Sequence, residues 1–83
     1  MFTVYVLKSL NCSKFYVGFT SDLNARLIAH NHTQNKGWTK SFMPWEVVYS
    51  EIFDTKKNAM DREKQLKTAK GREFIKKEIL KIK

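Results

Sequence analysis

Five polar side chains along the chain have types and spacings suited to the hydrolysis of a phosphodiester bond. They are Tyr5, Tyr16, the pair Arg26 and His30 in one helical stretch, and Glu63 among the apolar positions of a later one. Such hydrolysis needs an activated water, neutralisation of the charge on the phosphate oxygens, and help for the leaving alkoxide. A carboxylate with a bound Mg²⁺, an arginine, and a tyrosine whose phenolate is stabilised by cations can supply these.

The stretch FYVGFT, residues 15–20, alternates as a half-buried strand does, with Tyr16 and Gly18 on the face opposite its apolar side chains. If the preceding loop closes around residues 10–11, Tyr5 lies directly opposite Tyr16, and a two-residue shift of register leaves them diagonal neighbours. Taken alone, the two tyrosines are more typical of an ordinary cross-strand aromatic pair, which is common in sheets. Gly18 slightly favours a functional face, because glycine inside a strand often marks a close approach to the backbone.

Arg26, His30 and Glu63 each have a structural alternative. Side chains four residues apart share a helix face, so Arg26 and His30 either bind a common anion or form an exposed pair in solvent. Glu63 lies on the inward arc of its helix, where an unpaired carboxylate is costly to bury. It is either a metal ligand or acid facing the sheet, or half of a surface pair with Lys67 that contributes about 0.2–0.5 kcal/mol.

Three strands and three helices must position these side chains. Segments rich in β-branched and aromatic residues alternate with helical patterns that follow Asp or Thr capping residues. The expected strands span residues 2–7, 15–20 and 45–53. The expected helices span about residues 22–31, 55–68 and 72–83, with Gly71 separating the last two. The order ββαβαα predicts an α+β fold, a small three-stranded antiparallel sheet flanked by helices.

The composition predicts one basic domain over residues 1–83. With 83 residues and 42% hydrophobic side chains, the chain can form one core but not two. Sixteen Lys and Arg against eight Asp and Glu give a net charge of +8, which favours a polyanionic partner such as nucleic acid. The single Cys12 fits a reducing compartment, so a cytoplasmic location is expected. No apolar run has membrane-spanning length and the first residues lack a secretory signal pattern, so no membrane association is expected.

Taken in order, these residues resemble the GIY-YIG nuclease superfamily. The tripeptides Val4-Tyr5-Val6 and Tyr16-Val17-Gly18 match its paired signature with conservative changes. The resemblance continues through Arg26 and His30, then through PWEVVYSE, and ends with REKQLK around Glu63, so it covers nearly the whole chain. The chain looks most like the short stand-alone members, whose whole length is one catalytic-type domain.

The chain departs from the family pattern at a few positions. Val4 replaces the leading Gly of the first tripeptide, and Val17 replaces Ile in the second; both are mild changes for strand residues. Many members carry an Asn late in the domain, whereas no Asn follows Asn58 here. Phe19 and Thr20 stand where some excision-repair members have a basic pair.

The resemblance implies a divalent-metal-dependent endonuclease acting on DNA, with Mg²⁺ or Mn²⁺ as cofactor. It gives Tyr5 and Tyr16 the activation of water or the relay of its proton, without deciding which is the base. It gives Arg26 the scissile phosphate and His30 a supporting contact to a tyrosine or phosphate. It gives Glu63 the metal.

Contacts with nucleic acid are expected at Gly18, where the missing side chain leaves room, and at Trp38, Lys40 and Lys67. Trp38 and Lys40 belong to a polar and aromatic connection, residues 32–44, whose length is more typical of a functional loop. The alternative from another class is a binding module that keeps the nuclease fold and holds phosphates through its lysines, with a salt-dependent affinity. A third is an adaptor within a larger assembly. The choice of DNA or RNA, a role in DNA repair or elsewhere, and the oligomeric state stay open.

Overall fold

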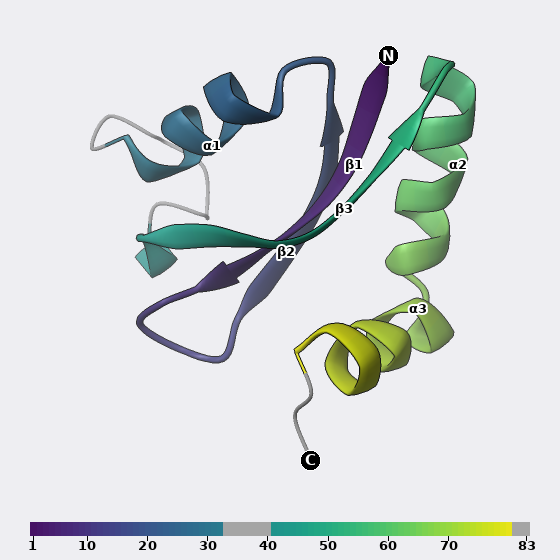
Figure 1. The fold of residues 1–83 in the computed structure, drawn as a ribbon. Helices are drawn as coiled ribbons and strands as arrows, with labels where there is room; N and C mark the ends of the chain where they lie inside the picture. Colours follow the sequence, from purple (N-terminus) through teal and green to yellow (C-terminus); the bar gives the residue numbers. More distant parts are fainter. Residues whose placement is uncertain (33–40, 81–83) are drawn as a thin grey trace.

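The computed structural model describes residues 1–32 and 41–80, which form one sheet with helices on both of its sides (Figure 1). The strands are β1 (Phe2–Ser9), β2 (Phe15–Thr20) and β3 (Trp45–Phe53). The helices are α1 (Leu23–Asn31), α2 (Lys56–Leu66) and α3 (Ala69–Phe74), followed by a π-helical turn, η2 (Ile75–Ile79). The expected α+β fold and the order of its elements are confirmed. Within the described residues, no helix has the length and apolar character needed to cross a membrane.

The sheet is antiparallel, with β1 in the centre of the order β2-β1-β3. The register of β1 and β2 places Tyr5 opposite Gly18 and Leu7 opposite Tyr16. The expectation that Tyr5 lies directly opposite Tyr16 is therefore wrong by two residues. Because side chains alternate with a period of two, this shift keeps both tyrosines on one face, where they are diagonal neighbours.

The register follows from a longer β1, which runs to Ser9. The Ser9 N–H donates to the carbonyl of Lys14 at 3.0 Å, so the hairpin loop is residues 10–13. The buried Ser9 hydroxyl donates to the carbonyl of Phe42 at 2.6 Å and accepts from the Asn11 N–H at 3.1 Å. Serine is a common turn former, and this contact with a distant segment, invisible in the sequence, keeps it in the strand.

Each side of the sheet carries its own packed cluster, because successive strand residues face opposite sides. In Figure 1, α2 and α3 lie on one side of the sheet and α1 on the other. The buried side chains on the α2 side are Val4, Val6, Val17, Ala59, Leu66 and Ile75. The buried side chains on the α1 side are Tyr5, Leu7 and Trp45, with Leu23 and Leu27 packed against them.

Gly71 does not separate the last two helices as expected, since it lies inside α3. The break falls at Lys67 and Thr68, and the Thr68 hydroxyl caps α3 by accepting from the Gly71 N–H at 3.1 Å. A Cβ at position 71 would lie 2.1 Å from the Gln65 carbonyl oxygen and 2.5 Å from the Leu66 Cα. Glycine is therefore required for the close approach of α3 to the end of α2.

A charged clamp fixes α2 to β3. The Arg62 guanidinium donates to the two carboxylate oxygens of Glu51 at 3.0 to 3.2 Å, and the Tyr49 hydroxyl donates to the same carboxylate at 2.5 Å. The ring of Phe74 packs with its centroid 5.8 Å from the guanidinium carbon. Because Glu63 directly follows Arg62, the clamp also sets where Glu63 stands relative to the sheet.

Candidate active site

Tyr5, Tyr16 and His30 form one aromatic cluster between β1, β2 and α1. The Tyr5 Oη and the His30 Nε2 are 3.1 Å apart, in a buried hydrogen bond. The Tyr16 ring centroid lies 4.8 Å from that of His30 and 6.2 Å from that of Tyr5. Tyr5 and His30 are only 1% and 6% exposed, whereas Tyr16 is half-buried. Tyr16 is therefore the phenol that a molecule arriving from solvent meets first.

Gly18 makes room for the two phenols. A Cβ at this position would lie 2.7 Å from the Tyr5 Oη and 2.9 Å from the Tyr16 Cε2, closer than packed atoms approach. The close approach to the backbone that the sequence indicates at Gly18 is thus made by side chains of the chain itself. A contact of Gly18 with nucleic acid stays a prediction.

Arg26 is exposed on α1, one turn before His30, and interacts with both phenols. Burial is the main cause that raises the pKa of Tyr5; hydrogen bonding to Arg26 opposes it, and the nearby Tyr16 and Glu63 add to it. Burial also lowers the pKa of His30, with repulsion from Arg26 as the second cause. At neutral pH the hydrogen bond between Tyr5 and His30 therefore joins two neutral groups.

Glu63 lies on α2, and its negative charge interacts with the cluster, since it is among the causes that raise the pKa of Tyr5. Its side chain is 20% exposed and pairs with the Lys67 Nζ at 3.4 Å, which is the surface pair that the sequence offered as an alternative. Among the described residues, no three His, Cys, Asp or Glu side chains gather into a metal-binding group. A single solvent-reached carboxylate still fits Mg²⁺, which keeps most of its waters and takes one or two carboxylates together with substrate phosphates.

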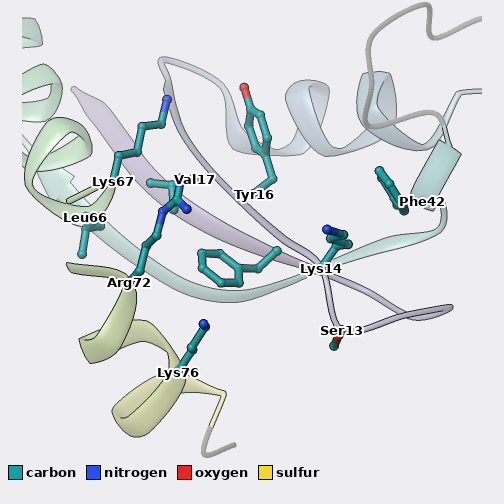
Figure 2. A pocket seen from close by; sticks show the side chains of 10 residues that line it. Ser13, Lys14, Tyr16, Val17, Phe42, Leu66, Lys67, Arg72 and Lys76 are labelled. Atoms are coloured by element: carbon teal, nitrogen blue, oxygen red, sulfur yellow. The ribbon is translucent and has the colours of Figure 1, made fainter. Parts of the chain in front are cut away.

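The predicted contact residues divide into those that the structure describes and those that it does not. Lys67 lines a groove that Tyr16 also lines, and Figure 2 shows both side chains extending to the same side. Trp38 and Lys40 lie outside the described residues. Of the five candidate catalytic residues, Tyr5, Tyr16 and His30 share one cluster. Arg26 lies beside this cluster, and Glu63 interacts with it from the helix on the other side of the sheet.

Asn31 is a positioning residue that the sequence does not reveal. Its side-chain amide donates to the carbonyl of Trp45 at 3.0 Å, and its side-chain oxygen accepts from the Trp45 N–H at 2.6 Å. These two bonds tie the end of α1 to the start of β3, and His30 is the preceding residue. Asn is common at the C-terminal end of helices, so its presence there does not stand out in the sequence. Only the contact with Trp45 identifies its role.

A small antiparallel sheet with two tyrosines, an arginine and a histidine on one face, and a helix glutamate behind, defines a nuclease-type domain. A family model described as the GIY-YIG catalytic domain matches residues 1–78. The chain belongs to the GIY-YIG family, a nuclease superfamily whose members are generally metal-dependent and typically act on nucleic acid.

The individual proteins to which the chain is similar are UPF0213 proteins. The chain is 40% identical over 65 residues to a UPF0213 protein of Staphylococcus saprophyticus and 42% identical over 65 residues to one of Staphylococcus epidermidis, and each match covers 78% of both chains. The solution NMR structure of a UPF0213 protein from Bacillus halodurans is 26% identical and has a TM-score of 0.53. That match covers 90% of this chain and 82% of the other. The family resemblance and the fold expected from the sequence are both confirmed.

Proposed function

We propose that the protein is a divalent-metal-dependent endonuclease that hydrolyses phosphodiester bonds in DNA. The observation that carries the proposal is the convergence of Tyr5, Tyr16 and His30 in one cluster beside Arg26, within reach of the charge of Glu63. The net charge of +8 supports a polyanionic substrate.

The hydrogen bond between Tyr5 and His30 provides a path for the proton of the attacking water. In the tautomer that carries its hydrogen on Nδ1, the His30 Nε2 accepts from the Tyr5 hydroxyl. The Tyr5 Oη can then take a proton from water while its own proton passes to His30, so no free phenolate accumulates despite the raised pKa of Tyr5. The hydroxide forms the new bond to phosphorus as the alkoxide leaves. Tyr16, beside the same imidazole, is the second candidate for this relay.

Arg26 would bind the scissile phosphate. Its exposed guanidinium can contact two phosphate oxygens at once. An anion there also screens the repulsion between Arg26 and His30, so the imidazole becomes a better proton acceptor when substrate is bound. Glu63 would hold the metal, which when bound supplies positive charge to the phosphate and the leaving oxygen. Lys67, now 3.4 Å from Glu63, would turn to a neighbouring phosphate.

The test is a cleavage assay on plasmid, branched and single-stranded DNA, with Mg²⁺ or Mn²⁺ and then with EDTA. Glu63→Gln keeps the shape of the side chain and is expected to abolish metal-dependent cleavage. The matched control is Glu73→Gln, which removes an exposed carboxylate that pairs with Lys77 at 2.6 Å. Binding of Mn²⁺, followed by electron paramagnetic resonance, should weaken in Glu63→Gln and not in Glu73→Gln. Equal cleavage by the wild type and Glu63→Gln contradicts the proposal.

A second candidate function is nucleic-acid binding without cleavage. The raised pKa of Tyr5 favours it, because a phenol that holds its proton is a poor base at neutral pH. Salt-sensitive band shifts with no nicking in either metal would establish the binding module. An adaptor would give neither shifts nor nicking.

A further inference from the structure

A groove of about 810 Å³ runs along β2, from Phe42 and the hairpin loop, past Tyr16 of the candidate active site, to α3 and η2 (Figure 2). Tyr16, which belongs to the candidate active site, stands partway along this lining, with Lys67 on one side of it and Lys14 and Phe42 on the other. On the same side as Lys67, Arg72 and Lys76 extend from α3 and η2 toward β2, and the end of the Arg72 side chain lies beside Val17. The groove is thus continuous with the site where the phosphate would be cleaved.

The lining of the groove is cationic. Four of its residues are basic and none is acidic. Within residues 1–32 and 41–80, no carboxylate forms an ion pair with Lys14, Arg72 or Lys76. Lys77, the neighbour of Lys76, pairs instead with Glu73 and does not line the groove. Like charges gathered around one cavity repel each other, and a chain of phosphates would relieve that repulsion.

Aromatic rings stand among these cations. Phe15 and Phe42 are half-buried and line the groove, and the Lys14 Nζ lies 6.0 Å from the Phe42 ring centroid. Unpaired bases stack on such rings, whereas the bases of a duplex stack on each other and do not reach them.

We propose that this groove binds a single strand of DNA that flanks the scissile phosphate. Its phosphates lie on Lys67, Arg72 and Lys76, and its unpaired bases stack on the two phenylalanine rings. Because Tyr16 belongs both to the groove and to the active site, a strand held in the groove leads directly to the reacting phosphate. This inference rests on the proposed function and deepens it: the substrate is DNA with a single-stranded segment beside the cleavage point.

Binding can be tested apart from cleavage, by fluorescence anisotropy in EDTA. The probes are a fluorescein-labelled twelve-nucleotide thymidine strand and a blunt duplex of twelve base pairs. The wild type is expected to bind the single strand more tightly. Arg72→Ala with Lys76→Ala should lower this affinity and reduce the slope of log K against log salt concentration by about 1.4, since each lost contact with a single strand contributes about 0.7.

The matched control removes two charges elsewhere, by Lys56→Ala with Lys57→Ala. These exposed lysines begin α2, about 15 Å along the helix from Lys67. Their removal should leave the slope unchanged. Phe15→Leu keeps an apolar side chain and should weaken single-strand binding about fivefold or more with the slope unchanged, because stacking carries no charge.

Two results would overturn the inference. One is an equal change of the salt slope in the Arg72 and Lys76 double variant and in the Lys56 and Lys57 double variant. The other is tighter binding of the duplex than of the single strand by the wild type. The outcomes separate the inference from the function on which it rests. If Glu63→Gln cleaves like the wild type while the Arg72 and Lys76 variant loses single-strand binding, the nuclease proposal fails and the groove stands. If cleavage depends on Glu63 but single-strand binding is unaffected by both pairs, the groove assignment fails alone.

Discussion

The two faces of the sheet are formed by the same strands and differ in what they bury. From β1, Val4 and Val6 point to the α2 side, while Tyr5 and Leu7 point to the α1 side. The α2 side is an aliphatic core, and the α1 side buries a phenol hydrogen-bonded to the imidazole of His30. The alternation of the strand thus gives one face an aliphatic core and the other face a mixed cluster, in which apolar side chains surround the candidate catalytic residues.

The helices on the two faces differ in the same way. α2 and η2 bury Ala59, Leu66 and Ile75, whereas His30 is the one buried residue within α1. α1 is held mainly by partly buried leucines and by the bonds of Asn31 to the backbone of Trp45. The α1 layer is therefore expected to open locally at lower cost than the α2 layer, as sites that admit substrate commonly do.

The largest expected effect comes from Tyr5→Phe, which removes one hydroxyl from the α1 side of the sheet. If Tyr5 relays the proton of water to His30, this variant should lower the cleavage rate by about 10²- to 10⁴-fold. Its stability should fall only by about 1–3 kcal/mol, the cost of leaving a buried partner unpaired. Single-turnover cleavage and urea unfolding measure the two quantities.

The control for Tyr5→Phe is Tyr49→Phe on the other face. It also removes a hydroxyl, the one that donates to Glu51 in the clamp between β3 and α2. It should reduce stability with cleavage per folded molecule unchanged. If both variants cleave equally well, the proposed division of work between the two faces is wrong.

The next effect is on stability and comes from Ile75→Ala. Ile75 is fully buried in the aliphatic cluster, and truncation of such a side chain costs about 2–5 kcal/mol. The matched control is Ile28→Ala, because Ile28 is 67% exposed on α1 and its truncation should change stability by less than about 0.5 kcal/mol. Urea unfolding of both variants tests the difference. Similar losses in the two would show that the α2 side is not the main core.

The elements of the fold could be predicted because their signals are local. The alternation of FYVGFT is a pattern of adjacent residues, and β2 forms over that stretch. Asp22 and Thr55 each accept from the N–H three residues later, and α1 and α2 begin directly after them. The register of the hairpin and the position of the helix break could not be predicted from the sequence. They depend on the contact of Ser9 with Phe42 and on how closely α3 approaches the end of α2, which are distances between segments.

The candidate site divides along the same line. A helical spacing of four places Arg26 and His30 on one face, so the sequence indicates that they are neighbours, and their binding of a common anion stays a prediction. The sequence does not reveal the hydrogen bond between Tyr5 and His30, because this bond depends on how α1 crosses the sheet. It also does not reveal that the missing side chain of Gly18 leaves room for both phenols. Asn31 shows the limit most clearly, because its role lies wholly in two bonds to the backbone of a distant strand.

The smallest expected effect is a dependence of stability on pH that belongs to the α1 face alone. Burial lowers the pKa of His30 in the folded protein, below about 6.5 for an unfolded histidine. Between these two values the unfolded chain binds more protons than the folded one, so stability is lost as the pH falls from about 6.5 toward the folded pKa. The slope is at most about 1.4 kcal/mol per pH unit, and below the folded pKa the loss from this group ends.

Urea unfolding at about pH 7.5 and about pH 5.5 measures this loss. In His30→Gln, which keeps hydrogen-bonding atoms beside Tyr5 but does not titrate in this range, the loss between the two pH values should shrink. The other histidine of the chain, His32, is exposed at the end of α1, and His32→Gln should keep the full dependence. An unchanged dependence in His30→Gln would mean that the imidazole is not held neutral by burial. The proton path from Tyr5 would then need another acceptor, and the α1 face would lose the feature that distinguishes it from the α2 face.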